Sequence, residues 1–265
     1  MTATTPSSSA ALERPLLVVP TYCEAASLPE LLGAVLALPH SLHVLVVDDN
    51  SSDGTAEIVR RHPEYGRRVF LDWRPCKLGH GSAYRDGFAW AMQNGYTVII
   101  EMDADLSHDP RDIPRLLHTI GEGADLAVGS RYLDGINVIR WPLSRLLLSL
   151  GAGMFARGIT GLTLTDPTSG FKALRREVVR RLDWRQIRAE GYGFHIAVNF
   201  FAQRAGLRSR EISIVFTERR NGQSKFSAAI AVEAAGIVLK LGCIRLRDLF
   251  FRRPQESTSG EGKGV

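Results

Sequence analysis

Short apolar runs, separated by longer mixed segments, make up most of this chain. The runs are rich in Val, Ile and Leu, which is typical of strands that are buried on both faces of a sheet. The segments between them carry helical patterns, several of which open on a capping residue or a proline. We therefore predict strands at 16–20, 42–49, 68–72, 97–103, 124–132 and, at an edge, 210–216. We predict helices at 27–38, from 53 onward, and at 83–94, 110–122, 137–161, 175–182, 194–205 and 227–251.

The alternation of strands and helices predicts an α/β fold with a doubly wound, mostly parallel sheet and flanking helices. In such sheets the ligand crevice lies beyond the carboxyl ends of the strands. Polar side chains follow three of the predicted strands at this end: Tyr22 with Glu24, Asp48 with Asp49, and Asp103 with Asp105. We expect these three groups to converge on one rim of the sheet.

The pair Asp103 and Asp105 follows the apolar run 97–100. Side chains at positions i and i+2 of an extended segment point the same way, so the two carboxylates repel each other unless a cation or several donors lie between them. Mg²⁺ or Mn²⁺ would satisfy this pair, because such ions accept one or two carboxylates and complete their shell with water and substrate phosphate. The alternative is a solvated acidic turn before a helix that Asp109 or Asp112 caps.

Other segments carry candidate chemistry with open alternatives. Arg131, at the end of the strand 124–132, is either a surface charge or a bidentate partner for a diphosphate. The loop Gly79-His80-Gly81 has neither the dinucleotide nor the P-loop spacing, so it is either a tight turn or part of a nucleotide pocket. The segment 165–172 is predicted to be a turn over the site, with Asp166 as its one acid.

Two segments combine cations with large apolar side chains. In 137–161, arginines alternate with Trp, Leu and Phe, which fits either an amphipathic helix at a lipid headgroup layer or a core helix. The helix 227–251 ends in a basic and aromatic stretch, which fits either docking on an anionic bilayer or a solvated charge cluster. The sequence therefore predicts a C-terminal amphipathic helical appendage.

Composition narrows the range of partners. The chain has 265 residues, a formal net charge of +5 and a pI near 9.3, a mild basic excess that suits phosphate ligands or anionic lipid. No recognition helix or zinc module indicates nucleic-acid binding. Cys23, Cys76 and Cys243 are too scattered for a disulfide framework or a structural zinc site, which favours a reducing location.

The N-terminal residues and the two most apolar segments indicate whether the chain enters a membrane. Residues 1–13 are rich in Ser, Thr and Ala, so we expect a disordered leader rather than a secretory signal. The apolar segments 146–164 and 226–244 are interrupted by charges, well short of about 18 uninterrupted apolar residues. We divide the chain into the leader, a catalytic domain at 14–226, the amphipathic basic segment 227–253 and a disordered tail at 254–265.

With these segments in order, the chain resembles the family 2 glycosyltransferases with a GT-A fold, in particular the dolichol- or polyprenol-phosphate mannose synthases. The resemblance covers roughly residues 15 to 225. It rests on the strings VVPTYCE (18–24), VVDDNSSDGT (46–55), LGHGSAYRDGF (78–88), EMDADLSHDP (101–110), GSRY (129–132), DPTSGFKA (166–173), GYGF (191–194) and FTERRNGQSK (216–225).

The resemblance implies roles for residues at the matching positions. Nucleoside contacts fall on Pro20, Tyr22, Glu24, Val47 and Asp49. The metal and the diphosphate fall to Asp103 and Asp105, with the backbone of Ala104 lining the pocket and Ser107 standing where a Gln often gives a third metal contact. Phosphates of the donor or acceptor fall to Arg131, Arg219 and Lys225.

The implied reaction moves mannose from GDP-mannose onto a dolichyl or polyprenyl phosphate, with inversion to a β-linked product. The acceptor phosphate is already an anion, so no dedicated base is assigned, and Asp105 and Asp166 are the fallback candidates. Arg131 would help to stabilise the leaving nucleotide. We expect a peripheral protein on the cytoplasmic face of the membrane, which reaches its lipid at the surface itself or through a small membrane-anchoring subunit.

Some positions depart from the family pattern: Cys23 for Asn, Ser107 for Gln, Leu150 for Arg, and His195 and Ala197 for Gln and Glu. These departures bear on the acceptor side and on the metal shell. Two alternatives stay open. One is a UDP-sugar enzyme that transfers glucose or N-acetylglucosamine to undecaprenyl phosphate or to a cell-surface glycan. The other is a catalytically silent sugar-nucleotide-binding module. A nicotinamide dehydrogenase is disfavoured because no Gly-x-Gly-x-x-Gly follows the first strand.

Overall fold

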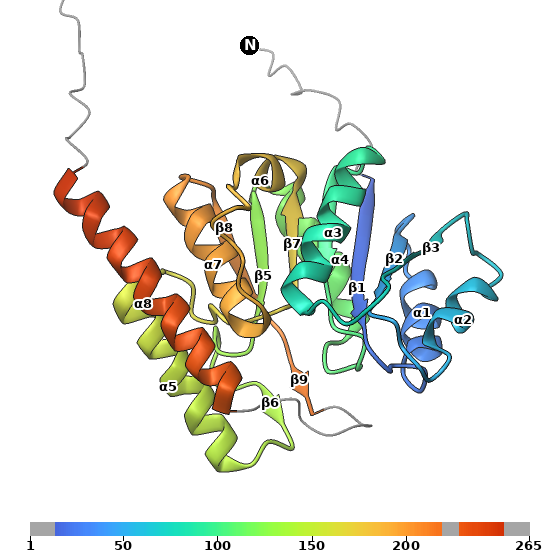
Figure 1. Cartoon of the computed structure of the whole chain (residues 1–265), viewed down its shortest axis with the longest axis horizontal. Coiled ribbons are helices and arrows are strands. Elements are labelled where there is room, and N and C mark those ends of the chain that lie inside the picture. Colours follow the sequence, from blue (N-terminus) through green and yellow to red (C-terminus); the bar gives the residue numbers. More distant parts are fainter. Residues whose placement is uncertain (1–13, 219–227, 252–265) are drawn as a thin grey trace, which may run out of the picture.

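A seven-stranded mixed sheet forms the centre of the structure, a computed structural model that describes residues 14–218 and 228–251 (Figure 1). The strand order is β3-β2-β1-β4-β7-β5-β8. The strands are β1 (Pro15–Thr21), β2 (His43–Asp48), β3 (Val69–Trp73), β4 (Val98–Glu101), β5 (Leu126–Ser130), β7 (Lys172–Arg175) and β8 (Ser209–Ser213). All neighbouring pairs are parallel except those that β7 makes with β4 and β5. The predicted doubly wound, mostly parallel α/β fold is therefore confirmed.

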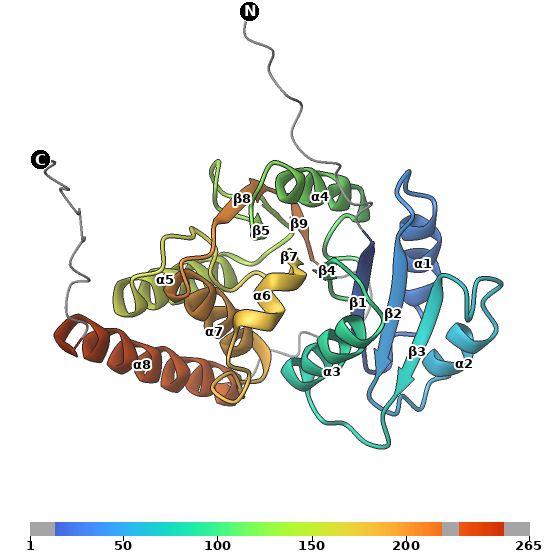
Figure 2. The same ribbon diagram turned by 90° about the horizontal axis from the view of Figure 1, so that it is seen from above.

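Helices cover both faces of this sheet (Figure 2). They are α1 (Leu28–Leu36), α2 (Thr55–Arg60), α3 (His80–Gln93), the short 3₁₀ helix η1 (Pro110–Asp112), α4 (Ile113–Gly121), α5 (Leu143–Thr160), α6 (Arg176–Arg181), α7 (Gly191–Arg204) and α8 (Ala228–Phe251). Two short strands, β6 (Val138–Ile139) and β9 (Phe216–Thr217), pair in parallel beside the main sheet. Asp109, one of the two predicted N-caps, accepts a hydrogen bond from the Arg111 amide and caps η1.

Two hydrophobic cores lie on opposite faces of the sheet. In β1 the side chains of Leu16 and Val18 belong to the core under α3 and α7, whereas those of Leu17 and Val19 belong to the core under α1 and α4. This division follows from the two-residue period of a strand, and it explains why the strand reads as a continuous apolar run rather than an alternating one.

Strand β7 is the main difference from the sequence-based prediction. We predicted a turn through residue 172, but Lys172 lies in the middle of the sheet and its side chain is fully buried, donating to Asn199 Oδ1 at 3.2 Å. The segment between Lys172 and Arg175 contains only two apolar residues between two cations. Such a short, charged segment gives no strand signal, because its burial depends on the neighbours that pack around it.

Helix α8 packs against both α5 and α7 at the end of the molecule that is opposite α1 and α2 (Figures 1 and 2). Arg204 of α7 forms an ion pair with Asp248 of α8. Helix α5 buries Gly153, Ala156 and Thr160 toward the protein and leaves much of its remaining surface exposed. Among the helices that the structure describes, none combines the length and the apolar character needed to span a bilayer.

The approach of α3 to β1 gives a test of the packing. Gly87 of α3 lies so close to Val18 that an added Cβ would overlap the Val18 Cγ1 atom. We expect Gly87→Ala to lower the free energy of unfolding by about 1–3 kcal/mol, because the helix or the strand must shift. Gly33→Ala in α1 is the matched control, since a Cβ there meets no atom within 4 Å. This variant should gain about 0.4–1 kcal/mol from reduced backbone entropy of the unfolded chain.

Urea unfolding followed by circular dichroism measures both values. Equal stability of Gly87→Ala and wild type would contradict the close packing of α3 on the sheet.

Candidate functional site

A cavity of about 410 Å³ opens at the carboxyl ends of β1, β2 and β4, and we call it the strand-end cavity. Pro20 near the end of β1 lines this cavity, as do Tyr22 and Glu24 in the segment that follows the strand. Asp49, the residue after β2, also lines it. The predicted convergence of three polar strand ends is therefore confirmed for these groups and for Asp103 and Asp105.

The backbone turns sharply where these three strands end. Cys23, Asn50 and Leu106 each adopt a left-handed conformation, with φ of 59°, 56° and 60°. A positive φ is uncommon for residues other than glycine and costs free energy, so neighbouring contacts must hold it. The amide of Cys23, for example, donates to Ser51 Oγ at 2.8 Å, which ties the loop after β1 to the loop after β2.

The adjacent acids Asp48 and Asp49 do different things. The Asp48 carboxylate is buried and accepts hydrogen bonds from Thr21 Oγ1 at 2.8 Å and from the Ser51 amide at 2.9 Å. It therefore holds the two loops together. Asp49 faces the strand-end cavity, accepts a hydrogen bond from the Gly79 amide at 3.2 Å and forms an ion pair with buried Arg74.

In the segment Gly79-His80-Gly81, only Gly79 lies outside α3, because the helix begins at His80. Gly79 has a φ of 105°, and a Cβ on it would lie 2.6 Å from a Glu190 carboxylate oxygen, so the turn requires glycine. Gly79 and His80 also line the strand-end cavity.

Asp103, Ala104 and Asp105 line the opposite wall of the strand-end cavity, after β4. Asp103 Oδ1 lies 3.3 Å from His80 Nε2. Burial raises the pKa of Asp103, but the hydrogen bond and the charge of His80 outweigh it and hold the pKa well below its usual range. Asp103 is therefore ionised at neutral pH.

The acid pair fits a divalent cation. The Asp103 carboxylate faces the strand-end cavity and keeps accepting capacity beside its contact with His80 Nε2, because each carboxylate oxygen carries two lone pairs. No group of three or more His, Cys, Asp or Glu side chains with metal-binding geometry occurs within residues 14–218 and 228–251. Two carboxylates nevertheless suffice for a metal that takes its other ligands from a diphosphate and water.

Ser107, the third predicted metal contact, lies behind this pair. Its side chain is buried, its amide donates to Asp105 Oδ1 at 3.0 Å, and its carbonyl accepts from the Thr217 amide at 3.1 Å. The backbone of Ser107 therefore orients Asp105, and a side-chain contact with a metal stays a prediction.

Arg131 and Asp166 form a buried ion pair between the end of β5 and the turn before β7. Arg131 Nε donates to Asp166 Oδ2 at 2.6 Å, and a terminal nitrogen donates to Asp166 Oδ1 at 2.7 Å. Burial alone would raise the pKa of Asp166, but the charge and hydrogen bonds of Arg131 lower it below its usual value. Asp166 is thus an ionised partner that orients the guanidinium, and its role as a base has no geometric support here.

The same guanidinium donates to Thr168 Oγ1 at 2.7 Å. Arg131 lines a second cavity rather than the strand-end cavity. The structure therefore places Arg131 in a different cavity from Asp103 and Asp105, with which sequence reasoning had grouped it.

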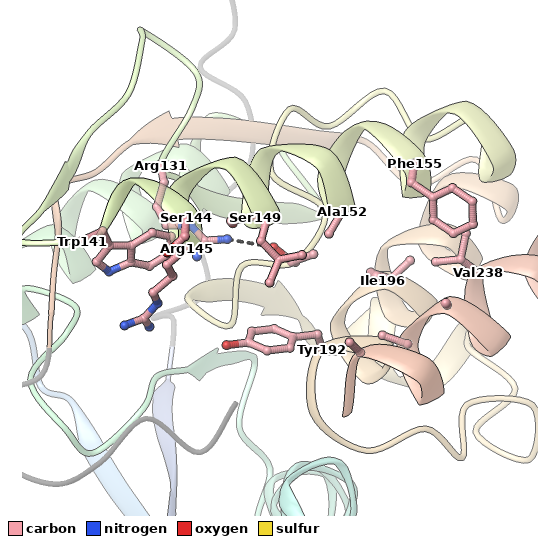
Figure 3. A pocket seen from close by; sticks show the side chains of 15 residues that line it. Arg131, Trp141, Ser144, Arg145, Ser149, Ala152, Phe155, Tyr192, Ile196 and Val238 are labelled. Carbon is pink, nitrogen blue, oxygen red and sulfur yellow. Dashed lines mark hydrogen bonds between the residues drawn. The ribbon is translucent and has the colours of Figure 1, made fainter. Parts of the chain in front are cut away.

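This second cavity, which we call the interhelical cavity, encloses about 440 Å³ between α5, α7 and α8 (Figure 3). Its one end is cationic and aromatic, with Arg131, Trp141 and Arg145. Arg145 pairs with Glu218 at 2.7 Å and lies 4.3 Å from the centre of the Trp141 ring.

The other end of the interhelical cavity is apolar, with Phe155, Ile196 and Val238. Between the two ends the walls are built largely of alanines, which leave the space open. They are Ala152 of α5 and Ala231, Ala234 and Ala235 of α8. Thr168 and Tyr192 line both cavities.

Glu101, the last residue of β4, is buried and contacts a histidine of α7. Glu101 Oε2 lies 3.1 Å from His195 Nδ1, and buried Lys172 lies nearby. Burial and the charge of Lys172 lower the pKa of His195 to about 4, against the opposing effect of Glu101. The imidazole is thus neutral at pH 7 and contributes no charge to the site.

The remaining predicted residues lie elsewhere. Val47 belongs to the core and its side chain is fully buried. Arg219 and Lys225 lie outside the described residues, as do the predicted leader and tail. Sequence reasoning gave no individual role to four cavity residues that lie inside or beside the quoted strings: Lys77, Thr168, Glu190 and Tyr192. Their positions in or near the motifs GHG, DPTSG and GYGF were the available signal.

Comparisons with known proteins agree with this geometry. The family model described as glycosyl transferase family 2 matches residues 16–183. The chain is 41% identical over 234 residues to a polyprenol monophosphomannose synthase of Mycolicibacterium smegmatis, covering 87% of each chain. It is 42% identical to an undecaprenyl-phosphate mannosyltransferase of Micrococcus luteus, covering 86% of this chain and 94% of that one.

A dolichol-phosphate mannosyltransferase of Pyrococcus furiosus is 35% identical, over 82% of this chain and 60% of that protein. Among solved structures, glucosyl-3-phosphoglycerate synthase of Mycobacterium tuberculosis superimposes with a TM-score of 0.67 at 19% identity, over 91% of this chain and 87% of that one. That structure is a complex with Mn²⁺, uridine diphosphate and the glucosylated product. At this identity the likeness concerns the fold. Because the family model matches well over half of the chain and two relatives exceed 40% identity across most of their length, the chain belongs to glycosyl transferase family 2.

Proposed function

We propose that this protein transfers mannose from GDP-mannose to a polyprenyl phosphate and forms a β-linked lipid-phosphate sugar. The observation that carries the proposal is the junction of the two cavities. One has carboxylates suited to a metal and a diphosphate, and the other has a cationic end and an apolar end. A sugar nucleotide and a lipid phosphate together need this combination. The names of the relatives support mannose as the sugar and a polyprenyl phosphate as its acceptor.

The donor occupies the strand-end cavity in this proposal. Tyr22 and Asp49 lie at the end near β1 and β2, where the nucleoside would bind, and the acid pair lies at the diphosphate end. Asp103 and Asp105 would hold Mg²⁺ or Mn²⁺, which would supply Lewis-acid stabilisation of the charge on the leaving diphosphate. Arg219 and Lys225 remain proposed phosphate contacts by their position in the motif.

The acceptor occupies the interhelical cavity. Arg131 and Arg145 give its phosphate two guanidinium groups, and Trp141 helps to fix the second of these. The isoprenoid chain then lies toward Phe155 and Val238, where burial of its methylene and methyl groups favours binding. An acceptor without a lipid chain would leave this end of the cavity unfilled.

The chemistry requires orientation more than proton transfer. An acceptor phosphate oxygen forms a bond to the anomeric carbon while the bond from that carbon to the diphosphate breaks, and the nucleotide leaves with the electron pair. The phosphate monoester is already ionised at neutral pH, so no side chain has to remove a proton. The contribution of the protein is to hold the two reactants in line, as the adjoining cavities do.

Exposed apolar stripes on α5 and α8 support a position at a bilayer surface. On α8, Val232, Leu239 and Leu246 recur every seven residues and are all more than half exposed. On α5, Leu143 and Leu147 are exposed at a spacing of four. Exposed Lys240 and Arg247 each follow a residue of the α8 stripe, so cations lie beside apolar side chains as they do in interfacial helices.

The first test is a transfer assay. Radiolabelled GDP-mannose, a divalent metal and polyprenyl phosphate should give label in the organic phase after lipid extraction. Asp105→Asn should lose at least about 100-fold in kcat, because the variant loses a charge at the metal and diphosphate. Asp183→Asn, an exposed acid away from both cavities, should keep wild-type activity. Chelation of the metal should abolish transfer by wild type.

Retention of transfer by Asp105→Asn would contradict the assigned role of the acid pair. Label transferred from UDP-glucose or UDP-N-acetylglucosamine in preference to GDP-mannose would replace the proposed donor.

The second test concerns the acceptor end. Arg145→Met should raise KM for polyprenyl phosphate by about tenfold, equivalent to a loss of about 1.4 kcal/mol, while KM for GDP-mannose stays at its wild-type value. Arg180→Met on α6 removes an exposed arginine that lines neither cavity and controls for the change in net charge. If Arg145→Met raised only the KM for GDP-mannose, the assignment of Arg145 to the acceptor would be wrong.

The third test is flotation with vesicles that contain anionic lipid. Wild type should float with them, and Leu147→Glu with Leu239→Glu should weaken binding by about tenfold or more, because each change replaces apolar burial by a charge. Tyr65→Glu, which alters an exposed aromatic residue beside β3, is the control. Wild type that does not bind vesicles, yet is active on lipid, would favour a membrane-anchoring subunit instead.

A further inference from the structure

The two cavities meet at one tyrosine and one threonine. Tyr192 and Thr168 are the residues that line both the strand-end cavity and the interhelical cavity. Figure 3 shows the Tyr192 ring projecting from α7 across the interhelical cavity, toward the end that holds Trp141 and Arg145. Tyr192 is 39% exposed, so part of its surface is accessible to solvent.

Contacts with two helices hold the backbone that carries Tyr192. The carboxylate of Glu190, two residues earlier, accepts a hydrogen bond from the Ser82 amide at 3.0 Å and pairs with Arg85 at 3.0 Å, both on α3. The amide of Glu190 donates to Glu233 Oε1 of α8 at 3.0 Å. The start of α7 is thus fixed to the two helices that flank the cavities, and Tyr192 is presented from a rigid base.

Thr168 is fixed just as firmly on the opposite side. Its hydroxyl accepts a hydrogen bond from Arg131 at 2.7 Å and donates to Asp166 Oδ1 at 3.1 Å. The Thr168 hydroxyl is therefore hydrogen-bonded directly to the guanidinium of Arg131, which binds the acceptor phosphate in the proposed function. Thr168 and Tyr192 lie where the two cavities adjoin.

We propose that Tyr192 is a positioning residue for the transfer step, with Thr168 as the fixed wall opposite it. Its ring lies against the reacting hexose and excludes water from the anomeric carbon, and its hydroxyl orients the acceptor phosphate. This inference rests on the proposed function and adds to it the group that directs the sugar to lipid phosphate instead of water.

Two reactions compete at the anomeric carbon, and they differ in the nucleophile and in whether a proton is released. In transfer, the acceptor phosphate dianion forms the new bond to carbon, and the nucleoside diphosphate leaves with the electrons of the broken bond. In hydrolysis, a water oxygen forms that bond, the nucleotide leaves in the same way, and a proton is released to solvent. Tyrosine suits the choice between them, since it combines a flat apolar face that packs on a sugar ring with a polar tip.

The experiment measures both products from radiolabelled GDP-mannose: labelled lipid in the organic phase and free mannose in the aqueous phase. Tyr192→Phe keeps the ring and should lower kcat for transfer by about tenfold, while the rate of free-mannose release stays at its wild-type value. Tyr192→Ala should lower kcat for transfer by about 10- to 100-fold and raise the rate of free-mannose release severalfold. Neither variant should change the affinity for GDP.

Phe155→Ala is the comparison variant. It removes an aromatic ring from the interhelical cavity at the far apolar end. It should raise KM for polyprenyl phosphate and leave the rate of free-mannose release at its wild-type value.

The outcomes separate this inference from the proposed function. If wild type makes no lipid product, the proposed function fails and the inference fails with it. If wild type transfers mannose but Tyr192→Ala keeps the wild-type rate of free-mannose release, the inference alone is overturned. Should Tyr192→Ala lose GDP binding or its folded melting transition, Tyr192→Phe decides: a wild-type kcat in that variant overturns the role of the hydroxyl.

Discussion

The junction of the two cavities is held by one buried ion pair, between Arg131 and Asp166. Neither side chain has more than a few per cent of its surface in water. Removing two charges from water is costly, so the pair is stable only because each charge is closely hydrogen-bonded to the other. Loss of either partner would leave an unpaired charge in the protein interior.

The position of that pair explains why it matters for function. It joins the end of β5 to the turn that leads into β7, and the same guanidinium holds Thr168. The pair thereby fixes where the cavity over the sheet meets the cavity between the helices. Both carboxylate oxygens of Asp166 accept hydrogen bonds from Arg131 and orient its guanidinium. The guanidinium keeps its charge at physiological pH, because the carboxylate raises the pKa of Arg131 despite its burial.

The sequence allowed much of the sheet to be predicted, and the reasons are local. The apolar runs of β1, β2 and β4 are long enough to be read alone, and the polar residues that follow each of them lie on one rim because parallel strands share a direction. Strand β7 could not be read in this way, since Lys172 lies between β4 and β5 and its buried ammonium group donates to Asn199, twenty-seven positions later in the chain. The interhelical cavity was likewise out of reach, because it exists only where α5, α7 and α8 come together. Local pattern also failed to separate Asp48 from Asp49, as their division of labour depends on Thr21 and Arg74 from other strands and loops.

The alanines that line the interhelical cavity have a consequence for how such enzymes diverge. A methyl group is the smallest side chain that still closes a helix surface, so Ala152, Ala231, Ala234 and Ala235 set the calibre of the passage between α5 and α8. Each of them lies outside the strand-end cavity. Calibre can therefore change by single methylene increments at these helix positions while the nucleotide half of the molecule stays as it is. Substitutions at these alanines would thus alter which isoprenoid chain fits the interhelical cavity and leave the specificity for the sugar donor unchanged.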